Sequence, residues 1–308
     1  MSVVAVSGTS GFLGRHLCQE LAARAHQVCG LSRSQLSSQD LAAGLHGVET
    51  LVHLAARAHV LADTSDDPIA QFRASNVVLT QAAALAARQA GVKRFVFVSS
   101  AGVLGATSPP EGFREESVPH PHDAYTASKW QAEEWLDCEI APHMEVVVLR
   151  PPLIYGPGAK GNLMRLLRLA LRGWPVPIGA LRAPRSLVAV RNIVDLICVL
   201  ASDPGAVRGT MLVADRETIS VADLFRTTAR HAGYRPWLAP VSPTLIKVAL
   251  SLTGRGSDIA RLTGPFVLHP QTAQTKLQWT PPYSQEAELR RTALCELQSF
   301  DIPPGRIG

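Results

Sequence analysis

Three residues with acid–base or hydrogen-bonding side chains are spaced for proton transfer: Ser100, Tyr125 and Lys129. The tyrosine and the lysine are four residues apart in a stretch expected to be helical, so their side chains share one face. The ammonium group favours the phenolate form of its neighbour. The serine closes an expected strand, where its hydroxyl can hold a substrate oxygen. Each feature alone is common in structural roles, but the three in this order predict proton transfer at a substrate oxygen.

A glycine-rich turn indicates what would exchange a hydride with that substrate. Gly8, Gly11 and Gly14 lie where an expected strand at 3–7 leads into an expected helix at 12–25. Glycines let the backbone approach a pyrophosphate, and the start of a helix offers free N–H groups to the anion. The alternative is a turn that only packs helix against strand. Its place at the start of the chain favours a dinucleotide.

The end of the second expected strand, 27–31, bears on which dinucleotide binds. An acidic residue at this place would hold the ribose 2′-hydroxyl of NAD. This chain has Ser32 and Arg33 instead, and an arginine can meet a 2′-phosphate. A solvated surface arginine is the alternative. The sequence favours NADP(H), with NAD(H) possible.

Alternating strand and helix patterns predict an α/β fold, a Rossmann-like doubly wound parallel sheet. The interval from 33 to 51 is too short for a complete strand and crossover helix, so the third strand is expected to be missing or very short. The expected strands are 3–7, 27–31, 51–54, 94–99 and 144–150, and the long helices are 12–25, 68–90 and 123–141.

Prolines punctuate the chain after residue 150 and predict a smaller C-terminal substrate lobe. Expected strands at 186–190 and 210–214 flank a helix at 192–201 and are predicted to return to the sheet. The predicted dinucleotide-binding domain is therefore 1–150 plus 186–214, and the substrate lobe is 151–185 plus 215–308. Further helices are expected at 162–172, 221–232, 244–253 and 285–297.

Composition narrows the class of protein. Apolar residues make up 46% of the chain, and the five cysteines are scattered, which is typical of reduced thiols in the cytoplasm. No apolar run reaches membrane-spanning length. No membrane is therefore an expected partner. The net charge is +5, but the basic residues are not clustered as in nucleic-acid-binding proteins, so no nucleic acid is expected as a partner either. The histidines show no metal-ligand spacing, so no metal is expected.

Five segments together resemble the extended short-chain dehydrogenases, the NAD-dependent epimerase/dehydratase family of sugar-nucleotide enzymes. They are the glycine turn, 53–56 (HLAA), 99–105 (SSAGVLG), the Tyr125/Lys129 pair and 150–158 (RPPLIYGPG). The resemblance implies that Ser100, Tyr125 and Lys129 are the catalytic set and that Asn76 lies on the helix behind the site. It also implies a homodimer through helices 68–90 and 123–141.

The same resemblance implies two sets of binding residues. The cofactor would contact Gly8, Ser10, Gly11, Phe12, Leu13, Gly14, Ser32, Arg33, Leu54, Ala55, Ala56, Ser99, Tyr125, Lys129 and Pro152. A UDP-sugar would contact Ser100, Ala101, Asn162, Arg185 and Arg261, although Asn162 could instead cap a helix and the two arginines could be surface charges. The chain departs from the family pattern at the lost third strand, at Arg191 and at His269–Pro270.

Three functions remain open at this stage. Segment 150–179, with 185–188, most resembles a bacterial subgroup that is often labelled UDP-glucose 4-epimerase-like and includes the 4-ketoreductases making UDP-N-acetylquinovosamine. Because Ser32 and Arg33 stand where an acid would hold NAD, reduction of a UDP-4-keto-6-deoxy-hexosamine with Tyr125 as proton donor is favoured. A UDP-hexose 4-epimerase with bound NAD is the alternative, and a non-catalytic cofactor-binding regulator is the second. A dehydratase is disfavoured, because Ala101 and Gly102 beside the serine transfer no proton.

Overall fold

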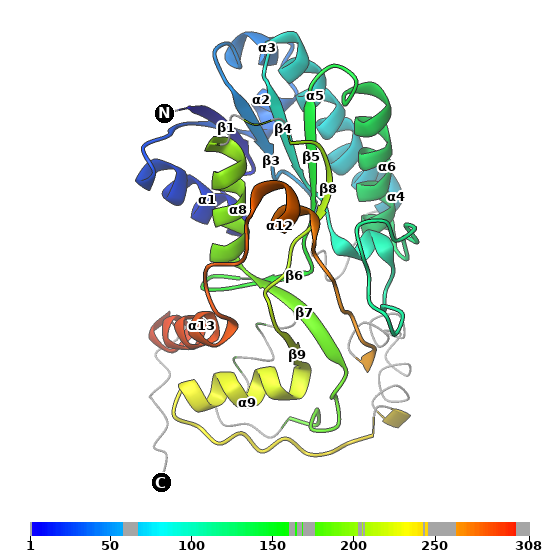
Figure 1. Ribbon diagram of the computed structural model, residues 1–308, viewed down its shortest axis with the longest axis vertical. Coiled ribbons are helices and arrows are strands. Elements are labelled where there is room, and N and C mark those ends of the chain that lie inside the picture. The colour runs from blue at the N-terminus through cyan, green and yellow to red at the C-terminus, as the bar shows by residue number, and fades with distance from the viewer. Residues whose placement is uncertain are drawn as a thin grey trace.

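The larger part of the molecule is built around a six-stranded parallel sheet (Figure 1). The computed structural model describes residues 2–57, 67–159, 164, 168, 176–202, 205, 207–242, 244–245 and 263–299. The strands lie in the order β2 (Gln27–Leu31), β1 (Val3–Ser7), β3 (Thr50–His53), β4 (Arg94–Val98), β5 (Glu145–Arg150) and β8 (Gly209–Leu212). All neighbouring pairs are parallel, which confirms the predicted Rossmann-like fold.

Helices cover both faces of this sheet because its strands alternate buried side chains between two apolar cores. Val4 and Val6 face one core, while Ala5 between them faces the other. The first core is covered by α1 (Phe12–Ala23), α8 (Val190–Ser202) and α12 (Thr272–Leu277). The second is covered by α2 (Arg33–Leu36), α3 (Leu41–Gly44), α5 (Leu79–Gln89) and α6 (Ala124–Glu139).

The expected loss of the third strand is confirmed. Residues 32–49 are all described, and they hold only the two short helices α2 and α3. Leu36, Leu41 and Leu45 from this stretch are buried against the sheet. Strand β2 consequently pairs only with β1 and forms the edge of the sheet.

The helical run predicted at 68–90 is interrupted in its middle. It consists of α4 (Pro68–Arg73), a π-helical turn η1 (Ala74–Val78) and α5. Asn76 in this turn is fully buried, where its amide accepts from the Arg57 N–H at 2.7 Å and donates to Ser128 Oγ at 3.0 Å. The turn thus connects this run to α6 through a buried polar side chain, and a buried amide needs such partners.

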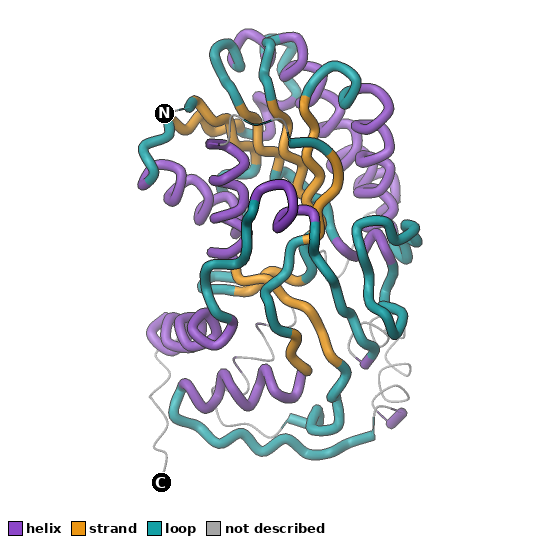
Figure 2. The backbone as a smooth tube through the Cα atoms, viewed as in Figure 1, coloured by secondary structure: helices purple, strands orange, loops and turns teal. Residues whose placement is uncertain are grey.

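A second, three-stranded sheet forms the smaller lobe, as Figures 1 and 2 show below the main sheet. Strand β7 (Pro184–Ala189) pairs in parallel with β6 (Leu153–Tyr155) and antiparallel with β9 (Thr218–Ser220). The prediction that strand 186–190 returns to the main sheet is therefore wrong. Both faces of β7 are buried, Val188 in one core and Leu187 in another, and such an apolar run does not specify which sheet it joins. The predicted strand at 210–214 does return, as β8.

Two described helices of the lobe pack on this small sheet. Helix α9 (Val221–His231) and helix α13 (Gln285–Ser299) correspond to predicted helices and pack against each other. The helices predicted at 162–172 and 244–253 lie mostly outside the described residues. No described helix is long and apolar enough to cross a membrane.

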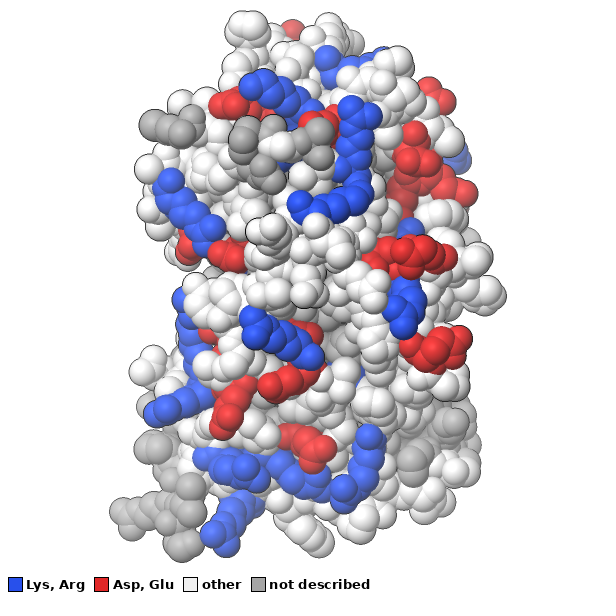
Figure 3. Space-filling model, in the orientation of Figure 1, with Lys and Arg blue, Asp and Glu red and all other residues white. Residues whose placement is uncertain are grey.

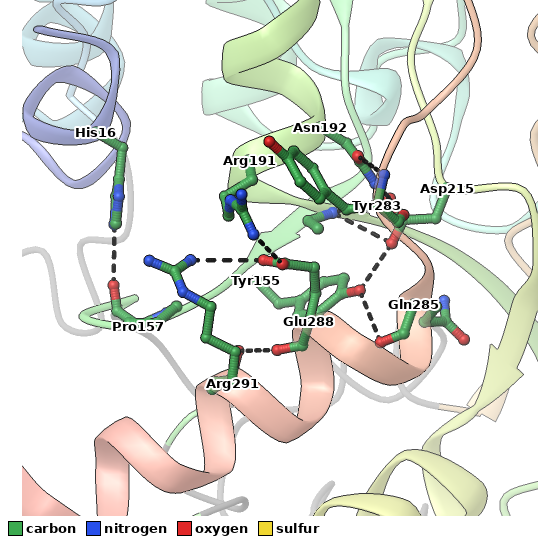
Figure 4. Close-up of polar contacts among 12 residues, drawn as sticks. His16, Tyr155, Pro157, Arg191, Asn192, Asp215, Tyr283, Gln285, Glu288 and Arg291 are labelled. Atoms are coloured by element: carbon green, nitrogen blue, oxygen red, sulfur yellow. Dashed lines mark hydrogen bonds and ion pairs between the residues drawn. The ribbon is translucent and has the colours of Figure 1, made fainter. Parts of the chain in front are cut away.

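A buried polar cluster joins the lobe to the main domain (Figure 4). The carboxylate of Asp215 accepts from Tyr155 Oη at 2.8 Å, from Asn192 Nδ2 at 2.7 Å and from the Ala189 N–H at 3.0 Å. Asn192 on α8 also exchanges two hydrogen bonds with the backbone of Tyr283. Burial raises the pKa of both the Tyr155 phenol and the Asp215 carboxyl. The cluster therefore ties β6, α8 and the start of α13 through one carboxylate.

Removing one donor from this cluster should destabilise the protein. We expect Tyr155→Phe to lower the free energy of unfolding by about 1.5–3 kcal/mol, because a buried carboxylate loses a hydrogen bond. Tyr283→Phe is the matched control, since the described contacts of Tyr283 are made by its backbone and ring face. Urea unfolding of both variants tests this, and equal stability of the two would contradict the assigned role of the Tyr155 hydroxyl.

Candidate active site

The glycine turn lies where β1 ends and brings three backbone segments into close contact. Gly8 has φ +75°, and a Cβ there would lie 2.9 Å from the Ala55 nitrogen. A Cβ on Gly14 would lie 2.2 Å from the Gly8 oxygen, and one on Gly11 would lie 3.1 Å from it. A side chain at Gly8 or Gly14 would clash with this backbone, so only glycine fits at these two positions.

Helix α1 begins directly after this turn with its N-terminus uncapped. Gly11 at the N-cap makes no side-chain hydrogen bond, and the first turn has no acidic residue. The N–H groups of the first turn, in Phe12, Leu13 and Gly14, have no intrahelical partner and carry the positive end of the helix dipole. Ser10 is exposed beside them. This arrangement fits the pyrophosphate of a dinucleotide.

The segment predicted to run past the cofactor lies against this turn. The buried hydroxyl of Ser7 accepts from the N–H groups of Leu54 at 3.1 Å and Ala55 at 3.2 Å. Residues 54–56 are half-buried, and the close approach of Ala55 to Gly8 fixes their place. The structure thus brings Leu54, Ala55 and Ala56 beside the glycine turn, and their contact with a cofactor stays a prediction.

Ser32 and Arg33 lie at the neighbouring strand end. Ser32 caps α2 by accepting from the Gln35 N–H, while the Gln35 side chain accepts from the Ser32 N–H. The end of β2 is adjacent to the turn, since a Cβ on Gly30 would lie 3.4 Å from Thr9. Arg33 is exposed, and its guanidinium forms no hydrogen bond or ion pair with any residue that the structure describes. It is available to an anion near the glycine turn.

Helix α6 carries the candidate acid–base residues and packs along β4. Tyr125, Lys129 and Glu133 are four residues apart and share one face. The Lys129 Nζ lies 4.2 Å from the centre of the Phe97 ring on β4. Tyr125, half-buried in the first turn of the helix, lies edge-on to Phe72 with ring centres 6.2 Å apart. The helix therefore directs this face onto the carboxyl end of β4.

Ser100 lies beside the first turn of the same helix. A Cβ on Gly102 would lie 3.0 Å from Thr126 Cγ2 and 3.2 Å from Ser100 Oγ, so the serine and the N-terminus of α6 are close neighbours. Asp123 and Thr126 hold that helix end with reciprocal cap bonds. The Ser100 hydroxyl accepts only from the Gly102 N–H, at 3.1 Å, among described groups. Its proton and a lone pair remain for a substrate oxygen.

The adjacent serine does something different. The hydroxyl of Ser99 donates to the Glu133 carboxylate, which also pairs with Arg150 at 2.6 Å. All three side chains are about 4% exposed, so this is a closed, buried group. Ser99, predicted to contact the cofactor, therefore has its hydroxyl turned into the core rather than toward the glycine turn.

Lys129 and His53 form an unusual buried pair of bases. Lys129 is 1% exposed, and burial lowers the pKa of its ammonium group to about 7, while the Glu133 carboxylate partly opposes this. Burial, with the charge of Lys129, lowers the pKa of His53 to about 3, so its ring is neutral. The ring stacks on Phe95 and Phe97, and its Nδ1 lies 3.0 Å from Ser7 Oγ. Its Nε2 is buried without a described partner.

The predicted substrate contacts are only partly described. Ala101 is fully buried and its N–H donates to the Pro151 oxygen at 2.8 Å, which places buried Pro152 next to the serine pair. Arg185 on β7 donates to the Gly264 oxygen at 2.8 Å, with its guanidinium 5.7 Å from the Phe266 ring centre. Asn162 and Arg261 lie outside the described residues.

Besides the lost third strand, the chain departs from the family pattern at Arg191 and at His269–Pro270, and residues at both places make structural contacts. Arg191 on α8 pairs with buried Glu288 at 3.1 Å and lies 3.5 Å from the Tyr283 ring centre, within the cluster of Figure 4. The N–H of His269 donates to the Phe113 oxygen, and its ring lies where a Cβ on Gly112 would be. No described group of His, Cys, Asp and Glu side chains could hold a metal ion.

Sequence reasoning missed the importance of Glu133 and His53. Glu133 follows Lys129 by one helical repeat, and this spacing alone could have placed its carboxylate on the same face. His53 ends a strand of otherwise apolar residues beside the glycine turn, which was the available signal. Their partners come from other strands, so neither contact is visible in the local sequence.

The buried lysine predicts a pH-dependent stability. A pKa lowered to about 7 means that the folded chain binds fewer protons than the unfolded chain between pH 7 and 10.5, so stability rises with pH in that window. We expect Lys129→Met to be the more stable protein at pH 7, by on the order of a few kcal/mol, with the difference shrinking as the pH rises. Urea unfolding across the window measures this, with exposed Lys93→Met as control. Parallel curves for wild type and Lys129→Met would refute it.

The glycine turn predicts a second effect. In Gly14→Ala the new methyl group meets the Gly8 oxygen at 2.2 Å, so the turn must move and the pyrophosphate cradle with it. We expect the affinity for NAD(H) or NADP(H) to fall at least about ten-fold, as measured by nucleotide fluorescence titration. Gly44→Ala is the control, because nothing lies within 4 Å of its added Cβ. Unchanged affinity in Gly14→Ala would show that this turn is only a packing device.

Comparison with known proteins agrees with this geometry. Residues 4–214 match the NAD dependent epimerase/dehydratase family. A UDP-glucose 4-epimerase from Vibrio cholerae is 32% identical over an alignment of 314 residues that covers 96% of each chain. The solved structure of MoeE5 in complex with UDP-glucose and NAD is 25% identical, with a TM-score of 0.77, over 96% of this chain and 99% of that one.

A reductase shares the same architecture. The dTDP-4-dehydrorhamnose reductase of Bacillus anthracis, solved in complex with NADP, has a TM-score of 0.75 over 96% of this chain and 99% of its own. At 20% identity this likeness shows the fold alone. The family match spans the main sheet and the candidate catalytic residues, and the V. cholerae relative extends it to the lobe. The chain is an enzyme of the NAD-dependent epimerase/dehydratase family.

Proposed function

We propose that this enzyme reduces the 4-keto group of a UDP-4-keto-6-deoxy-hexosamine. The observation that carries the proposal is the placement of Ser100 beside the first turn of α6, with Tyr125 and Lys129 on one face of that helix. These are a hydrogen-bond donor, an acid and a cation around one substrate oxygen. The UDP-sugar class is supported by the V. cholerae epimerase and by MoeE5, whose structure holds UDP-glucose.

The residues divide the reaction between them. A nicotinamide cofactor bound at the glycine turn would supply the hydride that reduces the C4 carbon, and it would leave oxidised. Ser100 donates a hydrogen bond to the carbonyl oxygen, Tyr125 transfers its proton to that oxygen as the alcohol forms, and Lys129 favours the resulting phenolate. Gly8, Gly11 and Gly14, with the N-terminus of α1, hold the pyrophosphate. Lys129 also binds the nicotinamide ribose in this proposal.

The choice of reduction rests on the end of β2. Ser32 is committed to capping α2, no acid is present to hold a ribose 2′-hydroxyl, and the Arg33 guanidinium is exposed near the glycine turn. This supports NADP(H): a ketoreductase consumes NADPH and releases NADP+ in each turnover. NAD(H) is the alternative, because the structure of MoeE5 contains NAD.

A UDP-hexose 4-epimerase is the second candidate, and one observation favours it. The V. cholerae 4-epimerase matches this chain over almost its whole length. The same three residues would serve, with NAD kept bound and the hydride returned to the opposite face of the keto sugar. Dehydration is disfavoured, because Ala101 and Gly102, which follow Ser100, carry no group that transfers a proton.

The enzyme is also proposed to be a cytoplasmic homodimer. The helical run from α4 to α5 exposes Ile69, Val78 and Leu85, at 70%, 51% and 42%. This run packs beside α6, so the exposed apolar side chains lie on the pair of helices that the family resemblance assigns to a dimer contact. All five cysteines are free, which supports the cytoplasm.

The decisive experiment follows nucleotide oxidation with a defined keto sugar. With UDP-4-keto-6-deoxy-N-acetylglucosamine, we expect rapid loss of NADPH absorbance and a slower reaction with NADH. Tyr125→Phe should lower kcat by about 10²–10⁴-fold, because it keeps the ring and removes the transferred proton. Arg33→Ala should raise the KM for NADPH about ten-fold and leave that for NADH unchanged. Arg88→Ala, on the far end of α5, is its control.

The other outcomes separate the candidates. Silence with the keto sugar, together with interconversion of UDP-hexoses without added reductant, would replace the reductase by the epimerase. Silence in both assays, with biological activity retained by Tyr125→Phe, would indicate the cofactor-binding regulator.

A further inference from the structure

Three arginines gather on the lobe, far along the chain from the catalytic residues. Arg226 and Arg230 lie one turn apart on α9, and Arg235 lies in the segment that follows. With Tyr234 and Pro236 they line a surface hollow of about 490 Å³ that has no acidic residue in its wall. Figure 3 shows basic side chains across this lower end of the molecule, below the small sheet. The fold thus concentrates positive charge that the sequence distributes over ten positions.

Little within the described protein neutralises this charge. Arg226 pairs with Asp223 at 2.7 Å, within the same helix and partly exposed. Arg230 and Arg235 are exposed and form no hydrogen bond or ion pair with any residue that the structure describes. Like charges held together repel, and an anionic partner would relieve that repulsion.

A large apolar side chain, that of Trp237, follows Arg235 by two residues in the chain. Trp237 is 70% exposed, whereas the next residue, Leu238, packs inward against Phe225 and its neighbours. The backbone here is held by hydrogen bonds from the Val176 N–H to the Trp237 oxygen and from the Ala239 N–H to the Val176 oxygen, both at 3.1 Å. The indole is therefore presented outward by an ordered backbone. Leu245, 62% exposed, follows on the same segment.

We propose that this surface, α9 with residues 232–242 and 244–245, docks on a lipid bilayer that carries anionic phospholipids. Arginines near an anionic bilayer are attracted to its surface, and tryptophan is favoured at the level of the headgroups. A free phosphate would account for the arginines but not for the exposed Trp237 and Leu245. No described helix can cross a membrane, so the contact is peripheral.

This proposal replaces the sequence-based expectation of no membrane partner. That expectation rested on the absence of an apolar run long enough to span a membrane, which does not bear on a basic surface that folding creates. The proposal does not depend on the proposed reductase function, because none of its residues belongs to the candidate active site.

Sedimentation with vesicles tests it on the full-length protein. We expect the wild type to pellet with vesicles of phosphatidylcholine mixed with phosphatidylglycerol, to remain in solution with phosphatidylcholine alone, and to be released by high salt. The variant Arg226→Gln/Arg230→Gln/Arg235→Gln should bind about a hundred-fold more weakly, at about five-fold for each arginine. Binding should also shift the tryptophan fluorescence to the blue in the wild type and not in Trp237→Phe.

A matched control removes the same charge elsewhere. Arg114→Gln/Arg208→Gln/Lys276→Gln also loses three positive charges, all from exposed side chains, and should retain vesicle binding. Equal loss in both triple variants would show a general effect of net charge and overturn the proposal. So would absence of vesicle binding by a wild type that binds inorganic diphosphate through the same arginines. An unchanged thermal midpoint of the triple variant shows that it is folded.

Discussion

The buried carboxylate of Glu133 is the constraint on which the candidate active site depends. It is about 4% exposed and needs compensating partners, which are Arg150 at the end of β5 and the Ser99 hydroxyl at the end of β4. Only one register of α6 brings the carboxylate between these two strand ends. That register places Lys129, one turn earlier, over Phe97, and places Tyr125 in the first turn of the helix, beside which Ser100 lies. The acid–base groups are thus positioned by a charge that takes no part in the reaction.

The same carboxylate shares its surroundings with the lysine it positions. Glu133 opposes the loss of charge on Lys129 that burial causes, while His53 below the lysine stays neutral. A neutral histidine adds no second positive charge beside Lys129. In a similar way, the buried carboxylate of Asp215 anchors the lobe to α8. Two buried carboxylates therefore hold α6 to the main sheet and the lobe to α8.

Local patterns were sufficient for much of this structure. The alternating strands, the glycine turn and even the loss of the third strand follow from spacing and length, because each depends on residues close in the chain. The destination of β7 could not be predicted, since a strand buried on both faces carries no mark of its sheet. Nor could the π-helical turn, because the partner of Asn76 on α6 is 52 residues away.

The basic surface on the lobe was also not visible in the local sequence, because folding brings its arginines together. Arg226, Arg230 and Arg235 are ordinary in the sequence, where polar residues and a buried helix face separate them. Helix periodicity aligns the first two, and the return of the chain beneath α9 adds the third and turns Trp237 outward. The lobe therefore has two separate surfaces: one meets the main domain through Asp215, and the other carries the three arginines. An enzyme built in this way can be held at a charged surface without any change to the residues that perform its chemistry.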